Sequence, residues 1–224
     1  MPNLALIFPP HPPEQFGEVV RAAEQAGVPE LWIWEDCFRE AGIAMAAAAL
    51  AWTQRLRVGI GILPVPLRNP ALTAMELATL ARLFPGRLRP GIGHGVAGWM
   101  RQVGGGVESP LTLLGEHTAA IRALLHGETV STAGRYVTLD AVALDYPPQQ
   151  VPPLYVGGRG PRTLQLAGRL ADGAIYDEPL AGMPAAAEAL RAGWREAERP
   201  DEPEMVVWLD APDDASAAAV AAEV

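Results

Sequence analysis

Short apolar segments alternate with helical segments along most of the chain, and this alternation limits the possible folds more than any other feature. Apolar runs of four to eight residues between glycines or prolines are typical of buried strands. Strands that alternate with helices indicate a parallel sheet covered by helices, either doubly wound or closed into a barrel. We expect seven such strands, at residues 4–8, 31–34, 57–63, 87–93, 154–157, 173–176 and 205–209.

The segments between these strands carry helix signals. Phe16, Val19 and Ala23 recur at the spacing of a helical stripe that faces a core. Asn69 and Pro70 together favour a helix start, because asparagine accepts hydrogen bonds from free backbone N–H groups and proline at the first position loses none. A last helix is expected after residue 214.

One segment interrupts the alternation. Residues 129–139 have the pattern of a hairpin that turns near Gly134, and residues 146–153 are rich in proline. We interpret 127–153 as an insertion at the rim of one domain that spans residues 1–224. A closed barrel has eight strands in about 250 residues, so a barrel with seven strands would lack its eighth strand–helix unit.

No segment has the properties of a membrane span or an export signal. No apolar run approaches the roughly 20 residues of a membrane helix, and no basic stretch precedes an apolar one at the N-terminus. Half of the 224 residues are hydrophobic, and Cys37 is the single cysteine, which excludes internal disulfides and cysteine-rich zinc sites. We therefore expect a cytoplasmic, globular protein that does not enter a membrane.

The charged residues exclude several classes of function. A formal net charge of −9 without a basic stripe argues against binding to nucleic acid. All 17 cationic side chains are arginine. Without lysine, the chain cannot form the Schiff base of an aldolase or a pyridoxal phosphate enzyme, and it cannot supply the lysine of a P-loop.

Candidate catalytic residues follow the second and fourth strands, because catalytic groups in such folds lie after strand C-termini. Glu35 and Asp36 could transfer a proton or hydrogen-bond a cofactor ring, although on the residues alone a solvated loop with a helix cap is the more frequent explanation of such a pair. His94 stands between two glycines and could act as an acid near neutral pH. His117 and His126 are nine residues apart on one helix, so we expect no metal site.

Two glycine-containing segments could approach a ligand closely. Residues 59–70 end the third strand, and glycine there lets the backbone approach a flat ligand. Residues 156–163 open a helix, and their three glycines and two arginines could hold a phosphate. Alternatively, the glycines and prolines of the first segment only end a strand, and the second segment is a tight strand-to-helix turn.

Taken in order, these segments resemble the luciferase-like monooxygenase family, and in particular its F420-dependent branch. The resemblance covers roughly residues 4–176. Its motifs lie at residues 32–38, 57–70, 84–95, 156–162 and 169–174. It implies a TIM-barrel-type α/β fold, here a (β/α)8 barrel without its eighth unit, with a flavin or deazaflavin ring at the C-terminal mouth.

The resemblance also implies roles for individual residues. It places a non-prolyl cis peptide near Gly61 and Ile62, and the polar edge of the ring at Glu35 and Asp36. Gly93 and His94 would lie beside the ring, while Gly157, Gly158, Arg159 and Gly160 would bind the cofactor and its phosphate. F420 enzymes often have Asp-His at the end of the second-strand motif, whereas this chain has Asp36 and Cys37. His94 is the substitute for that proton-handling histidine.

The favoured hypothesis is an oxidoreductase that transfers a hydride between F420 and a small organic substrate, with His94, Asp36 and Glu35 as catalytic residues. An FMN-dependent monooxygenase, a truncated non-catalytic cofactor-binding protein and a phosphosugar isomerase are alternatives; the absent lysine argues against the isomerase. A homodimer is expected by resemblance. Substrate contacts are expected from the loop at 96–110 and from the hairpin near Gly134. In that loop Trp99, Met100 and Val103 suggest an apolar wall, although packing of the loop on itself explains them equally well.

Overall fold

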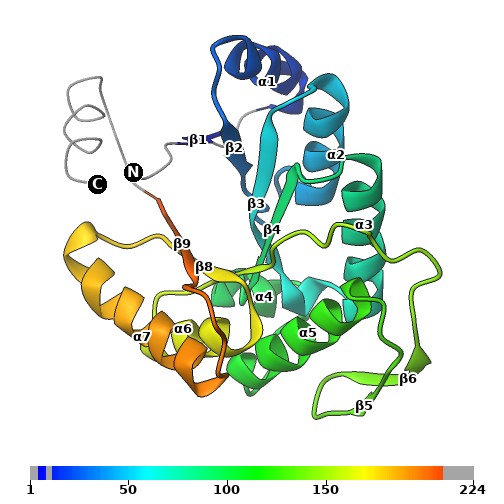
Figure 1. Cartoon of the computed structure of the whole chain (residues 1–224), viewed down its shortest axis with the longest axis vertical. Helices are drawn as coiled ribbons and strands as arrows, with labels where there is room; N and C mark the ends of the chain where they lie inside the picture. Colours follow the sequence, from blue (N-terminus) through cyan, green and yellow to red (C-terminus); the bar gives the residue numbers. More distant parts are fainter. Residues whose placement is uncertain (1–4, 9–11, 209–224) are drawn as a thin grey trace.

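A curled sheet of seven parallel strands forms the centre of the computed structural model, which describes residues 5–8 and 12–208 (Figure 1). The spatial order of its strands is β1-β2-β3-β4-β7-β8-β9. Every neighbouring pair is parallel, which confirms the predicted parallel sheet. The strands are β1 (Leu6–Ile7), β2 (Glu30–Ile33), β3 (Arg57–Pro64), β4 (Leu88–Gly93), β7 (Tyr155–Gly157), β8 (Gly173–Tyr176) and β9 (Glu204–Val207).

Helices cover the outside of this sheet, as expected for a barrel-type fold (Figure 1). The α-helices are α1 (Phe16–Gln25), α2 (Gly42–Trp52), α3 (Pro70–Leu83), α4 (Ala97–Gln102), α5 (Pro110–Leu125), α6 (Pro161–Leu170) and α7 (Met183–Glu196). Short 3-10 turns precede three of them, η1 (Pro13–Gln15), η2 (Val65–Leu67) and η3 (Leu180–Gly182). α6 and α7 pack closely, because a Cβ atom at Gly168 or Gly193 would meet the backbone of the other helix.

Helix starts and buried stripes follow the sequence signals with one exception. The Asn69 side chain accepts a hydrogen bond from the N–H of Ala71 at 2.9 Å, which confirms the predicted cap of α3. Phe16 and Ala23 are buried on α1, whereas Val19 is 39% exposed. The buried stripe of α1 is therefore narrower than the spacing of apolar residues predicts.

A polar network fills the N-terminal end of the space inside the curled sheet. The Glu30 carboxylate on β2 pairs with the Arg89 guanidinium on β4 at 2.9 Å and accepts a hydrogen bond from Nε1 of Trp32 at 2.6 Å. Arg89 also pairs with Glu204 on β9 and lies 4.9 Å from the centre of the Tyr155 ring on β7. The Tyr155 hydroxyl donates to the second oxygen of Glu204 at 2.7 Å. The network thus joins strands from both halves of the sheet.

The hairpin of β5 (Val130–Ala133) and β6 (Thr138–Val142) is antiparallel, as predicted. Its Val137 and Leu139 are buried against α3 and α5. The Glu116 carboxylate on α5 accepts three backbone N–H groups of the hairpin turn at 2.8 Å. These contacts fix the insertion to the outer helices.

β1 and β9 are the two ends of the sheet, and among the described residues no strand pairs with their outer edges. This agrees with the prediction of a barrel that lacks a strand–helix unit in the part of the chain described. The helix predicted after residue 214 lies outside the described residues. None of the helices described is both long and apolar enough to cross a membrane.

A second ionic cluster holds helices to the sheet from outside. Asp172, just before β8, accepts hydrogen bonds from Arg122 at 2.6 Å, from Arg199 at 2.8 Å and from the N–H of Leu154 at 2.9 Å. Burial acts to raise the pKa of Asp172, but these donors outweigh burial and hold the pKa below 3.8. The cluster connects α5, the segment after α7 and the start of β7.

Replacement of this carboxylate should weaken the fold in a pH-dependent way. We expect Asp172→Asn to lower the free energy of unfolding by about 2 kcal/mol at pH 7, because charged hydrogen bonds in a partly buried site are lost. A group with a depressed pKa stabilises the fold above its unfolded pKa, so the difference should shrink as the pH falls below 3.8. Denaturant titrations of both proteins at several pH values measure this difference in the free energy of unfolding.

Glu188→Gln is the matched control, since Glu188 forms an exposed ion pair with Arg195. Exposed pairs contribute about 0–1 kcal/mol. Equal stability of Asp172→Asn and the unmodified protein at pH 7 would contradict the role of Asp172.

Candidate functional site

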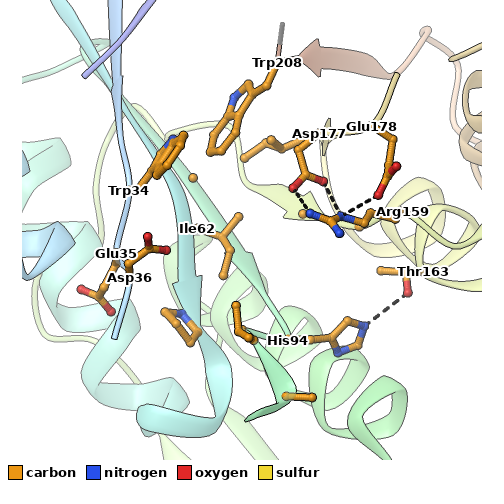
Figure 2. A pocket seen from close by; sticks show the side chains of 18 of the residues that line it. Trp34, Glu35, Asp36, Ile62, His94, Arg159, Thr163, Asp177, Glu178 and Trp208 are labelled. Carbon is orange, nitrogen blue, oxygen red and sulfur yellow. Dashed lines mark hydrogen bonds and ion pairs between the residues drawn. The ribbon is translucent and has the colours of Figure 1, made fainter. Parts of the chain in front are cut away.

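A cavity of about 990 Å³ opens at the C-terminal ends of the strands, where catalytic groups lie in folds of this kind (Figure 2). One wall carries Glu35 and Asp36, and the opposite wall carries Arg159 with Asp177 and Glu178, while Ile62 lies between them (Figure 2). The cavity therefore brings together residues from four of the segments that the sequence singled out.

Glu35 lines the cavity, but its carboxylate is already held by the protein. Its Oε2 atom accepts a hydrogen bond from the backbone N–H of Gly42 at the start of α2, at 2.6 Å. Both oxygens accept from the Arg68 guanidinium, at 2.8 and 3.0 Å. This arrangement suits a residue that positions the loop after β2 better than one that transfers a proton.

Asp36 differs from its neighbour, because its carboxylate has no hydrogen bond or ion pair with any described residue. Burial raises the pKa of Asp36 above 3.8, with opposing contributions from Arg39 and Glu40. Cys37 is not part of the cavity wall, and burial raises the pKa of its thiol. Asp36 is thus the carboxylate of this pair that can interact with a ligand.

His94 lies on the cavity wall below Arg159, and its Nε2 atom is 3.2 Å from Oγ1 of Thr163 on α6 (Figure 2). Burial lowers the pKa of His94 below 6.5, and the nearby Pro110 carbonyl partly offsets this effect. A neutral imidazole on the wall can accept a proton at pH 7.

The peptide bond between Gly61 and Ile62 is cis, at the position that the resemblance indicated. The Ile62 side chain projects into the cavity (Figure 2). A Cβ atom at Gly93 would lie 3.0 Å from Ile62, and one at Gly157 would lie 2.6 Å from it. Gly93 therefore makes room for Ile62 and is not itself part of the cavity wall, whereas Gly61 and Gly157 are.

The segment predicted to bind phosphate opens α6 and faces the cavity through Gly158, Arg159 and Gly160. α6 has no side-chain cap, but Pro161 has no N–H and Thr163 and Leu164 donate theirs to the Gly160 carbonyl at 3.0 and 3.1 Å. In its first turn the Arg162 N–H therefore remains available to a ligand. The Arg159 guanidinium, however, forms two hydrogen bonds with Asp177, at 2.7 and 3.0 Å, and an ion pair with Glu178 at 3.1 Å. Its charge is thus already compensated.

Aromatic side chains form much of the remaining wall. Trp34 and Trp208 stack with their ring centres 5.4 Å apart and their planes 13° from parallel. Trp99 and Met100 line the cavity, as predicted, but Val103 is 44% exposed and does not. No residue of the β5–β6 hairpin reaches the cavity either, which corrects the prediction of substrate contacts near Gly134.

Sequence reasoning missed Asp177, Glu178 and Trp208 as residues of the site, and it included Thr163 only as the end of the segment expected to hold a phosphate. Asp177 and Glu178 directly follow β8, and Trp208 directly follows β9. The rule that ligand-contacting residues follow the C-terminal ends of strands would have found these three. In the described part of the chain, no cluster of His, Cys, Asp and Glu has the arrangement of a metal site.

Comparison with known proteins shows which family the sequence of this chain matches. The model of the luciferase-like monooxygenase family matches residues 5–222. The chain is 30% identical over 172 residues to 5,10-methylenetetrahydromethanopterin reductase of Methanolobus tindarius, covering 76% of this chain and 52% of that protein. It is 35% identical over 208 residues to F420-dependent glucose-6-phosphate dehydrogenase of Kineococcus radiotolerans, covering 82% and 60%. It thus spans about half to three-fifths of these relatives.

Solved structures show the same fold. An F420-dependent secondary alcohol dehydrogenase, in complex with an F420–acetone adduct, matches with a TM-score of 0.83 and 25% identity, over 92% of this chain and 68% of that one. The oxygenating constituent of 3,6-diketocamphane monooxygenase from Pseudomonas putida, in complex with FMN, has a TM-score of 0.77 at 19% identity, over 92% and 66%. Both cofactor types therefore occur in proteins of this fold.

The environment of His94 leads to a prediction about its titration. Because burial lowers its pKa, we expect an NMR titration midpoint below 6.5, with the resonance assigned by comparison with His94→Gln. The unfolded chain binds this proton at about pH 6.5, so the unmodified protein should lose stability as the pH falls below that value, and His94→Gln should lose less. A midpoint at or above 6.5 would contradict this account.

Proposed function

The chain belongs to the luciferase-like monooxygenase family, and we propose that it is an F420-dependent oxidoreductase that transfers a hydride between F420 and a small organic substrate. The observation that carries the proposal is the cavity at the C-terminal ends of the strands, with Asp36 and His94 on its walls. The relatives that are named as F420-dependent enzymes support the choice of cofactor.

The residues of the cavity fit a planar cofactor with a phosphate-bearing tail. Its volume of about 990 Å³ is within the range of cofactor sites, and aromatic and aliphatic side chains line much of it. The buried indole N–H groups of Trp34 and Trp208 have no hydrogen-bond partner among the described residues. The start of α6, with Gly158 and Gly160 beside it, would hold the phosphate through the backbone N–H of Arg162 and the positive end of the helix dipole.

In this proposal the bound deazaflavin supplies the hydride chemistry, and the protein orients the substrate and moves a proton. His94 accepts the proton of a substrate hydroxyl, because its ring is neutral at pH 7 and Thr163 fixes its orientation. Asp36 hydrogen-bonds the ring or the substrate with its unpartnered carboxylate. Glu35 is a positioning residue, which acts through Arg68 and the start of α2.

A monooxygenase that uses reduced FMN and oxygen is the alternative, since the family to which the chain belongs is named for monooxygenases. We further propose that the protein is a cytoplasmic homodimer without affinity for nucleic acid. The formal net charge of −9 supports the last point, and sedimentation velocity would decide the oligomeric state.

The choice of cofactor is tested by parallel equilibrium titrations of the purified protein with F420 and with FMN. We expect F420 to bind at least about tenfold more tightly, a difference of about 1.4 kcal/mol. Tighter binding of FMN would favour the monooxygenase. Binding of neither cofactor would show that this chain lacks a working site.

The role of His94 is tested by replacement with alanine. We expect turnover to fall about 100-fold, which is typical for loss of a general acid or base, while the dissociation constant for F420 changes less than about threefold. His126→Ala is the matched control, because His126 is exposed at the end of α5, outside the cavity wall. Unchanged turnover in His94→Ala would remove this residue from the mechanism.

A further inference from the structure

The charge of Arg159 is the starting point, because a free arginine at the mouth of a cavity would attract anionic substrates. Asp177 binds this guanidinium through both oxygens, and Glu178 adds a second carboxylate to the same group. These three residues project from the loops after β7 and β8 toward one another (Figure 2). Two negative charges thus oppose one positive charge at this wall.

Apart from the paired Arg159, no described residue of the cavity wall supplies a positive charge. Of the side chains that line the cavity, Arg159 is the only arginine within the described residues, and lysine is absent from the chain. Arg68 lies behind Glu35 and is bound by Glu35 and Glu76, both at 2.8 Å. His94 is held neutral by burial at pH 7. Asp36 adds an unpartnered carboxylate on the opposite wall.

The rest of the wall suits an uncharged ligand. Trp34, Trp208, Trp99, Met100 and Ile62 present aromatic and aliphatic surface to the cavity. A substrate phosphate or carboxylate placed among these side chains, away from the start of α6 where the cofactor phosphate would bind, would lose water without gaining a cation, which is unfavourable. An uncharged hydroxyl or carbonyl group would lose less hydration free energy there, and it could form a hydrogen bond with Asp36 or His94.

We infer that Asp177 and Glu178 determine the substrate class: by occupying Arg159, they make the cavity selective for uncharged alcohols or ketones over phosphorylated or carboxylated compounds. The substrate class rests on the proposed function. The electrostatic part of the inference, that Asp177 and Glu178 neutralise Arg159, does not depend on the reaction. Among the relatives, it places the site nearer to an alcohol dehydrogenase than to a sugar-phosphate dehydrogenase.

The electrostatic part is tested without any cofactor, by calorimetric titration of the protein with inorganic phosphate. We expect Asp177→Asn/Glu178→Gln to bind phosphate at least about tenfold more tightly than the unmodified protein, because Arg159 is released. Addition of Arg159→Gln to this double variant should abolish the gain. Glu188→Gln on α7, which removes an exposed carboxylate outside the cavity wall, should leave phosphate affinity unchanged.

The substrate class is tested in the F420-loaded protein with propan-2-ol and lactate, which differ by one carboxylate. We expect kcat/KM for propan-2-ol to exceed that for lactate, and Asp177→Asn/Glu178→Gln to shift the ratio toward lactate by at least about tenfold.

A phosphate affinity that is equal in the double variant and the unmodified protein would overturn the inference. A gain that survives Arg159→Gln, or a preference of the unmodified protein for lactate, would also overturn it. Failure to bind F420 would instead overturn the proposed function and leave the phosphate titration as the test of Asp177 and Glu178.

Discussion

The ion pairs of Arg89 are the constraint on which the remainder of the structure depends. A guanidinium inside a curled sheet must be paired, because an unpaired charge there is strongly unfavourable. Arg89 meets this requirement through Glu30 on β2 and Glu204 on β9, which lie near opposite ends of the sheet. The sheet has to curl for these partners to meet. The same curl gathers the C-terminal ends of the strands around a single cavity at the other end.

Large side chains inside the sheet are matched by glycines on neighbouring strands. Trp32 lies where a Cβ atom at Gly59 would be 2.2 Å from its ring, and Trp208 occupies the space above Gly61 in the same way. Ile62 stands over the glycines of β4 and β7. The glycines in these strands therefore admit other side chains of the protein, and the shape of the cavity results from this packing.

The sequence was sufficient for the parallel sheet, its seven strands, the hairpin and the cap at Asn69, because these follow from local periodicity and backbone chemistry. The position of the hairpin was not predictable, since it depends on the contact of Val137 and Leu139 with distant helices. Glu35 and Asp36 were predicted as a pair with one role. Only the structure shows that Glu35 is paired and Asp36 is not, because Arg68, the partner of Glu35, is 33 residues away in sequence. The sequence position of Asp177 and Glu178 directly after β8 could have indicated them as residues of the site, but their pairing with Arg159 required the structure.

The stacked pair of Trp34 and Trp208 has an optical consequence. Two indoles with centres 5.4 Å apart and nearly parallel planes couple their electronic transitions, and coupled transitions in a chiral environment produce a paired circular dichroism band. The two rings come from loops after β2 and β9, so their coupling exists only while the two sides of the sheet are brought together. The protein thus contains an intrinsic spectroscopic reporter of the curl of its own sheet, which responds at the same place where a ligand would enter.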